Sequence, residues 1–226
     1  IKNNKQLKII DEKENMGKIE NINIITGILN EEGGVIQVTG GQIIGKSTNA
    51  NSHTNGISNK SNSNVIIIGG KVSGSGNASS GINNSGGNVK ITGGEISAEG
   101  WNCYGINNNG VVEMTGGKIS CDGENNYGIY NTSDGKIKIT GGELSCRGSY
   151  SYGIYNSYGE SIEITGGNII SISTRKNDGK SYGVYNTNDI NIIIGIKGDG
   201  QVSQKEPYIK GGYAETSGSR NWIWNI

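Results

Sequence analysis

The chain has 226 residues, of which 32 % are hydrophobic, 40 are glycine and one is proline. A compact globule of this length normally carries more hydrophobic residues, and disordered chains are usually rich in proline or strongly charged, so neither class fits. The 20 basic and 20 acidic residues cancel, and no apolar run approaches the length of a membrane span, which argues against a nucleic-acid partner and against a membrane-spanning segment.

Residues 1–18, "IKNNKQLKIIDEKENMGK", precede the first recognisable repeat. We expect them to be a linker or an N-terminal cap, and residues 19–226 to form one repeat domain.

An internal repeat occupies nearly all of the remaining chain. A Gly-Ile or Gly-Val dipeptide recurs every 23–30 residues, and an Asn stands two residues after each Ile or Val. These asparagines are Asn30, Asn59, Asn84, Asn108, Asn131, Asn156 and Asn186, and the terminal "NWIWN" repeats the pattern with Asn225. Self-similarity at such a period is typical of solenoids, propellers and repeat arrays.

Each repeat predicts three short strands. The first alternates apolar and polar residues, as in Val89–Thr92; the second follows a Gly-Gly, as in "EIS" after Gly94; the third is of the type "YGIYN". Helical periodicity is absent, and a narrow solenoid needs few apolar residues. We therefore expect an all-β, right-handed parallel β-helix of about seven to eight coils of three short strands.

The charges support coils stacked in register. Lys90, Glu113, Lys138 and Glu163 occupy one repeat position, and Lys71, Glu95, Lys118 and Glu143 another, and both series alternate in sign. Opposite charges on neighbouring strands stabilise a sheet, so both series are interpreted as scaffold rather than as a binding stripe. The Asn series is interpreted in the same way, as a ladder inside the turns, and Gly-Gly as a corner with positive φ.

Cys121 and Cys146 fill a repeat position held elsewhere by Gly45, Gly74, Ala98 and Ser171. This small-residue series predicts a cramped inward position, where two stacked thiols permit either a disulfide or two free thiols. Cys103 lies outside the series and has no evident partner in the sequence.

The tyrosines offer a candidate ligand-binding surface. Tyr104, Tyr127, Tyr152 and Tyr182 begin third strands, and by alternation should share the inward face of the Ile two residues later. Tyr130, Tyr155 and Tyr185, continued by Trp224, should then point outward, and the preceding segments with Trp101 and Tyr150 add possible walls. The outward row is either an aromatic stack that stiffens the sheet or a platform for the apolar faces of sugar rings.

Catalytic and metal-binding motifs are not found. Asp122 and Glu124 could belong to a calcium site, which needs six to eight oxygens, but one such pair is a small fraction of a ligand set. No cofactor is expected, with calcium the remaining alternative, and the protein is not expected to be an enzyme.

Units of the type "ITGGEIS…YGINN" and "ITGGELS…YGIYN", over roughly residues 19–226, resemble the Gly-Gly-rich β-helix repeats of secreted or surface-anchored proteins of Gram-positive bacteria. They are also similar to carbohydrate-binding members of the pectate-lyase-like superfamily. The resemblance implies an extracellular, adhesive or polysaccharide-binding module. Its partner would be a polysaccharide or a host or cell-surface glycan, and it would act as a monomer or as an end-to-end homo-oligomer. The alternatives are a passive stalk or fibre unit and, third, a polysaccharide lyase or hydrolase, although no catalytic residue of the lyases matches this chain.

Overall fold

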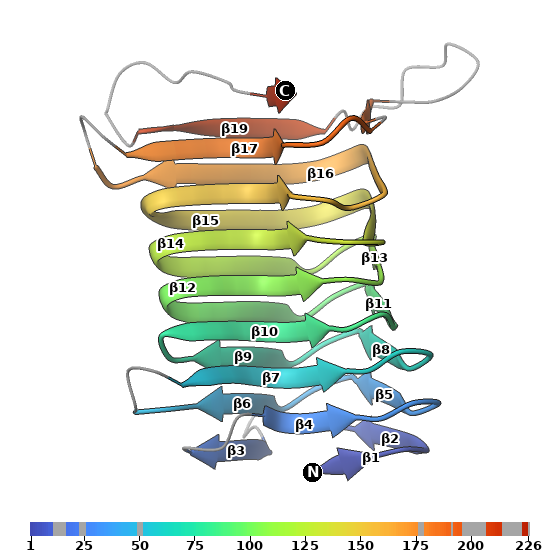
Figure 1. Cartoon of the computed structure of the whole chain (residues 1–226). Coiled ribbons are helices and arrows are strands. Elements are labelled where there is room, and N and C mark those ends of the chain that lie inside the picture. Colours follow the sequence, from blue (N-terminus) through green and yellow to red (C-terminus); the bar gives the residue numbers. More distant parts are fainter. Residues whose placement is uncertain are drawn as a thin grey trace.

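The computed structural model describes residues 1–10, 17–22, 26–48, 52–175, 179–190, 192–195, 207–213 and 223–225. These residues form parallel β-strands stacked into a solenoid, and none of them belongs to a helix that could cross a membrane. In Figure 1, near strands such as β7 and β10 run to the right, and far strands such as β6 and β9 run back to the left while the chain climbs toward its C-terminal end. This winding is right-handed, so the predicted fold class is confirmed.

Each turn contributes to three faces of the solenoid. The first face contains β2 (Gln6–Ile9), β5 (Val35–Val38), β8 (Asn64–Ile67), β11 (Asn88–Ile91), β13 (Val111–Met114), the first parts of β15 (Lys136–Asn156) and β16 (Ser161–Ser173), and β18 (Ile192–Ile194). The second contains β3 (Lys18–Ile22), β6 (Gln42–Lys46), β9 (Lys71–Ser75), the first parts of β12 (Glu95–Asn108) and β14 (Lys118–Asn131), later parts of β15 and β16, and β19 (Tyr208–Tyr213).

The third face contains β1 (Lys2–Asn3), β4 (Thr26–Asn30), β7 (His53–Asn59), β10 (Ala78–Asn84), the ends of β12, β14 and β15, β17 (Lys180–Asn186) and β20 (Ile223–Asn225). About six turns lie between Val35 and Asn186, slightly fewer than the seven to eight expected, and a partly described turn flanks them at each end. Residues 2–9 of the expected linker or cap form β1 and β2 in the first of these flanking turns.

One expectation about the strands needs correction. We predicted three separate short strands per coil, but β12 and β14 run without interruption from the second face to the third, and β15 continues through all three faces. The ladder persists around these corners because the neighbouring coils bend in register, pairing Gly100 with Gly123 and Gly123 with Gly148.

The core is made of columns of aliphatic side chains. Ile82, Ile106, Ile129 and Ile154 on the third face are fully buried, as are their equivalents on the other two faces. Each column stacks one residue per coil, so a chain with few apolar residues buries a continuous core at about 25 cal/mol for each Å² of apolar surface removed from water.

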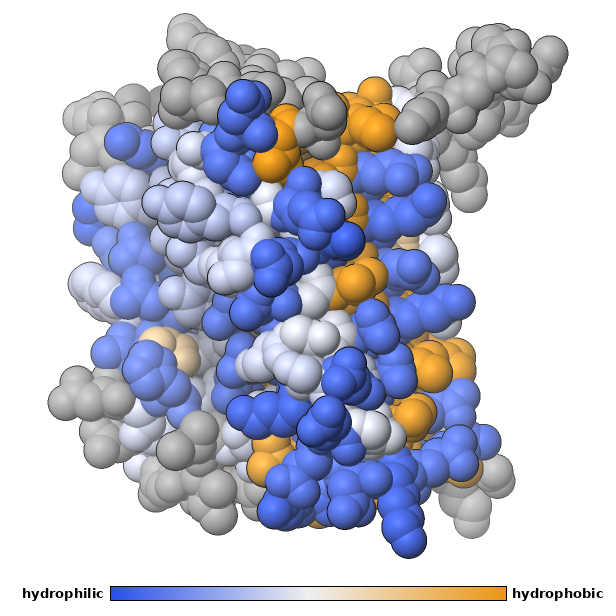
Figure 2. All heavy atoms as spheres, turned by 45° about the vertical axis from the view of Figure 1, so that its right-hand side comes forward, coloured by the Kyte–Doolittle hydropathy of each residue, from blue (hydrophilic) through white to orange (hydrophobic). Residues whose placement is uncertain are grey.

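The predicted charge rows are confirmed. Lys90 pairs with Glu113, Glu113 with Lys138, and Lys138 with Glu163 in neighbouring strands of the first face. On the second face, Lys71 and Glu95 are 3.2 Å apart, and Lys118 and Glu143 are 2.9 Å apart. Figure 2, which turns the first face forward, shows hydrophilic residues over most of this side, with hydrophobic residues in smaller patches among them.

Buried asparagines form a ladder where the third face meets the next turn. The side-chain Nδ2 of each donates to the Oδ1 of the next at 2.7–2.8 Å, in an unbroken series of Asn3, Asn30, Asn59, Asn84, Asn108, Asn131, Asn156 and Asn186. Nδ2 also donates to a turn carbonyl, as from Asn131 to Gly135 at 2.8 Å. In the Gly-Gly between the first and second faces, the second Gly has positive φ, 71° at Gly94 and 77° at Gly117. Both predicted scaffold roles are confirmed.

Candidate functional site

Two columns of tyrosines cover the outer surface of the third face. The leading column is Tyr104, Tyr127, Tyr152 and Tyr182, and the trailing column is Tyr130, Tyr155 and Tyr185. All of these side chains are half-buried. We call the two columns together the tyrosine face.

The leading column points outward, which corrects the expectation that it shares the inward face of the Ile. Asn126, Gly128 and Ile129 are buried, whereas Tyr127 and Tyr130 on either side are partly exposed. Gly128 and Ile129 follow each other and both point inward, which breaks the alternation of the strand. Only glycine fits at position 128. A Cβ at Gly128 would lie 2.3 Å from Leu144 Cδ2 and 2.5 Å from the Gly153 carbonyl oxygen. Strict alternation missed this bend, although the repeated Tyr-Gly-Ile-Tyr spacing was a usable signal.

The rings pack closely within and between the columns. In the leading column, neighbouring centroids are 5.1–5.5 Å apart and the rings are nearly parallel, at 7–18°. The trailing rings are 5.1–5.3 Å apart and more tilted, at 25–31°. Between the columns the rings meet edge to face, as for Tyr152 and Tyr155 at 5.0 Å and 85°, or tilted, as for Tyr182 and Tyr185 at 5.0 Å and 48°. Ring faces are therefore largely covered by other rings, and edges and hydroxyl groups face the solvent.

This packing changes the acidity of the phenols. Burial, followed by the neighbouring phenols, raises the pKa of Tyr127 to about 12. The same causes raise the pKa values of Tyr104, Tyr152 and Tyr155. An ionised ring is disfavoured here because its charge would be poorly hydrated, so the tyrosine face is an uncharged surface at neutral pH.

A rim borders the tyrosine face where the second face turns into the third. Trp101, Glu124 and Ser149 occupy the same corner position on three successive coils. This follows from the strand pairing, because the residues before and after each of them are in register with their equivalents on the next coil. Glycine lies just before each of them. A Cβ at Gly123 would lie 1.9 Å from the Gly100 carbonyl oxygen, so the tight corner requires glycine. After the corner, Trp101 is exposed and Glu124 is partly exposed, whereas Ser149 is buried.

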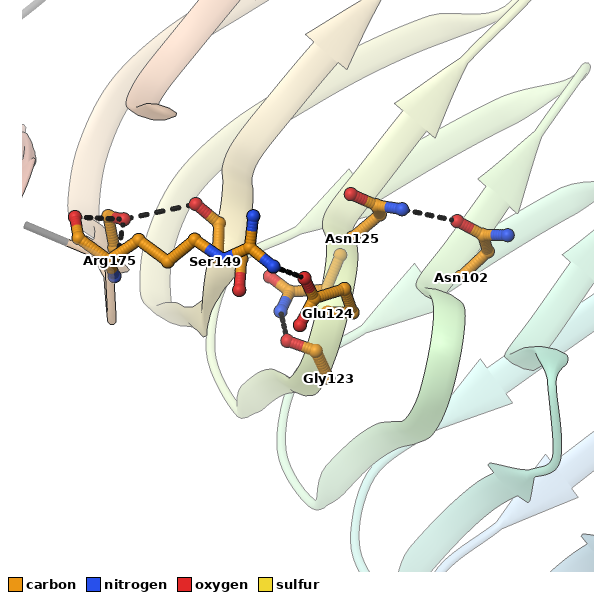
Figure 3. Close-up of polar contacts among 8 residues, drawn as sticks. Asn102, Gly123, Glu124, Asn125, Ser149 and Arg175 are labelled. Carbon is orange, nitrogen blue, oxygen red and sulfur yellow. Dashed lines mark hydrogen bonds and ion pairs between the residues drawn. The ribbon is translucent and has the colours of Figure 1, made fainter. Parts of the chain in front are cut away.

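An ion pair spans this rim. A guanidinium nitrogen of Arg175 donates to Glu124 Oε1 at 2.6 Å, two coils away, and the guanidinium carbon lies 5.7 Å from the ring centroid of Tyr150. Beside this pair, Asn125 Nδ2 donates to Asn102 Oδ1 at 2.9 Å. Figure 3 shows the Arg175–Glu124 and Asn125–Asn102 contacts lying next to each other along the corner.

The predicted site residues fall into two groups. Tyr130, Tyr155 and Tyr185 form one column, and the backbone of Trp224 continues it in register with Tyr185, while its side chain lies outside the described residues. Trp101 and Tyr150 lie on or beside the rim, within continuous strands rather than loops. The leading tyrosines, the Asn102–Asn125 pair and the Glu124–Arg175 bridge were not predicted.

Three buried thiols lie inside the wall beneath this surface. Cys121 and Cys146 pair in register, as predicted, and are 3 % and 1 % exposed. Cys103, which had no evident partner in the sequence, is also fully buried, and its thiol interacts with that of Cys121. All three are free thiols.

The calcium hypothesis stays a prediction. Asp122 lies exposed opposite Arg147 in the neighbouring strand, and Glu124 is bound by Arg175. Within the described ranges, no group of three His, Cys, Asp or Glu side chains is placed to hold a metal ion.

A shallow groove of about 430 Å³ lies on the first face, away from the tyrosines. It is lined by Val35, Asn64, Val65, Ile66, Asn88, Val89, Lys90, Val111 and Glu113. Among its polar side chains, Asn88 Nδ2 donates to Asn64 Oδ1 at 3.0 Å, and Lys90 lies opposite Glu113 in the neighbouring strand. This groove carries less specific chemistry than the tyrosine face.

In comparisons with protein families, curated proteins and solved structures, no match to this chain was found.

Proposed function

We propose that the protein is a non-catalytic, secreted or cell-surface module that binds a polysaccharide along the tyrosine face. The observation that supports this is the in-register array of phenols on four successive coils, flanked by the amides of Asn102, Asn107 and Asn125. Phenol and amide groups donate and accept hydrogen bonds, as sugar hydroxyls require, and the ring edges offer apolar contact.

The ring packing changes how such a ligand makes contact. Because neighbouring rings cover one another's faces, a sugar chain lying along the rod meets a row of hydroxyl groups and ring edges. The trailing column, whose rings are more tilted, offers more of its faces than the leading column. Hydrogen bonds from the hydroxyl groups are thus expected to contribute more than stacking.

Tyr-to-Phe substitutions separate binding from scaffolding. Replacing Tyr130, Tyr155 and Tyr185 together by Phe removes hydroxyl groups and keeps the ring stack. Affinity gel electrophoresis against a panel of polysaccharides should show about tenfold weaker retention of this variant, equivalent to about 1.4 kcal/mol, at an unchanged melting temperature. The polysaccharide itself should stay uncut. Unchanged retention of the triple variant would refute the tyrosine face as the binding surface.

One observation favours a second function, that of a passive stalk or fibre unit. Mutual covering of the Tyr127 and Tyr152 rings, 7° from parallel, is what a purely structural aromatic ladder would show. Within the described part of the chain, β3 and β19 each pair along one edge only, and open strand edges can template end-to-end assembly. Light scattering and electron microscopy over a concentration series test this: lengthening rods support assembly, and a constant monomer mass contradicts it.

A further inference from the structure

We propose that the rim around Trp101, Asn102 and Asn125 is a subsite for one uncharged pyranose unit of the bound polysaccharide. This rests on the proposed function and deepens it by naming the class of sugar and the residues that select it.

The first observation is the exposure of an indole. Trp101 is 59 % exposed, although it lies within the continuous strand β12. Its position follows from the corner, because Gly100 has a φ of 147° and leaves the next side chain outside the coil. An indole combines a large apolar face with one N–H donor, and the apolar C–H face of a sugar ring can cover it.

The second observation is a pair of amides with open hydrogen-bonding groups. Asn125 Nδ2 donates to Asn102 Oδ1, so Asn102 Nδ2 still offers a donor and Asn125 Oδ1 still offers an acceptor, neither with a partner among the described residues. The two amides lie on neighbouring coils, about 4.8 Å apart along the stack. Adjacent sugar hydroxyls, each able to donate and accept, match one donor and one acceptor at this separation.

The neighbours of the amide pair shape the subsite. In the same outer row, Ala78 pairs with Asn102 on one side and Tyr150 pairs with Asn125 on the other. The small methyl of Ala78 leaves space, whereas the Tyr150 ring, held beside the guanidinium of Arg175, closes the opposite end. Asn102 and Asn125 precede Tyr104 and Tyr127 by two residues on the same outer surface, so the rim is continuous with the tyrosine face.

Charge bears on the class of sugar. The described charged side chains around the rim are three negative and three positive, which balance: Glu99, Asp122 and Glu124 against Arg147, Arg175 and Lys180, the last in register with Tyr150. Arg175 is engaged by Glu124 at 2.6 Å, and its charge is therefore already matched. A carboxylated or sulfated sugar would gain no net attraction from this balanced set to offset the loss of its hydration, whereas an uncharged ring carries no such cost.

Variants of exposed rim residues test the proposal without disturbing the core. Trp101→Ala and Asn125→Ala are compared with Tyr208→Ala, which removes a 46 % exposed aromatic from the second face. Retention is measured in gels containing neutral polymers (glucan, mannan, xylan, chitin derivatives) or polygalacturonate, with melting temperatures as a folding control. We expect retention by a neutral polymer, weakened about tenfold or more by each rim variant and unchanged by Tyr208→Ala.

The other outcomes separate this inference from the proposed function. Retention that is insensitive to both rim variants, but lost in the triple Tyr-to-Phe variant, refutes the rim and leaves the tyrosine face standing. Retention by polygalacturonate alone overturns the assignment of an uncharged sugar. If no polymer in the panel retains the wild-type protein, both the proposed function and the subsite fail.

Discussion

The phenol rings of Tyr127 and Tyr152 are stacked, with their centroids 5.1 Å apart and their planes 7° from parallel. The two residues are 25 positions apart in the sequence and are brought together because β14 and β15 pair in register. A repeat that preserves an outward aromatic at one position thus builds a continuous aromatic ladder on the solenoid, and this ladder is both part of the scaffold and the candidate binding surface.

Removal of one central ring should destabilise the whole ladder. The Tyr127 ring contacts the rings of Tyr104, Tyr130, Tyr152 and Tyr155. Since an aromatic pair is worth about 0.5–1.5 kcal/mol beyond its buried area, we expect Tyr127→Ala to lower the free energy of unfolding by about 2–3 kcal/mol in urea denaturation. Tyr158→Ala is the control, because this side chain is 74 % exposed and makes no ring contact within the described ranges. Equal effects of both variants would contradict a structural ladder.

Stability should fall in alkali through the same rings. The pKa of Tyr127 is raised from 10.0 to about 12, so the folded protein holds this proton more tightly than the unfolded chain. The stabilisation that results is complete below a pH of about 10 and is lost as the pH rises toward 12. Thermal unfolding followed from pH 8 to 12 should show this decline, and Tyr127→Phe should reduce it. A variant with an unaltered pH dependence would show that other groups cause it.

The scaffold could be predicted from the sequence because the repeat aligns residues that interact with the equivalent residues of the neighbouring coils. The alternating Lys90, Glu113 and Lys138 series indicated the register, and the Asn series indicated the turns, since each depends only on the same position one coil away. The continuity of β12 and β14 was missed because a strand that bends at a corner and a strand that ends there show the same residue pattern in the sequence.

The candidate site was predicted only in part, for a physical reason. The outward direction of Tyr130 and Tyr155 followed from alternation, but that of Tyr127 depends on the bend at Gly128, which the Leu144 side chain and the Gly153 carbonyl impose. The Arg175–Glu124 ion pair joins residues 51 positions apart and outside equivalent repeat positions, so no repeat alignment reveals it.

Interruption of the asparagine ladder should lower the free energy of unfolding. Asn108 Oδ1 accepts from Asn84 Nδ2 and its own Nδ2 donates to Asn131 Oδ1, both at 2.8 Å and in buried surroundings. Asn108→Ala leaves a buried donor and a buried acceptor unpaired, and each such group costs about 1–3 kcal/mol. We therefore expect a loss of about 2–5 kcal/mol in the free energy of unfolding.

The matched control for this variant is the neighbouring outward residue. Asn107 is half-exposed and faces the opposite side of the same strand, so Asn107→Ala should change stability by about 0.5 kcal/mol or less. Comparable losses for the two alanine variants, measured by chemical denaturation, would show that the ladder contributes little beyond ordinary side-chain packing.

The buried thiols should resist chemical modification in the folded protein. Cys121 and Cys146 are 3 % and 1 % exposed, and Cys103 is fully buried. Burial raises the pKa of Cys121 well above its usual value, and the hydrogen bond with Cys121, followed by burial, raises that of Cys103. Since the thiolate is the reactive species, both lack of access and lack of ionisation slow the reaction.

A disulfide reagent at neutral pH should label the three thiols only after denaturation, and mass spectrometry should then count three adducts per chain. Fewer than three would reveal a disulfide, which the in-register spacing of Cys121 and Cys146, about 4.8 Å, permits. Rapid labelling without denaturant would mean that the coils around Cys121 open locally, and the wall beneath the tyrosine face would then be less rigid than its packing indicates.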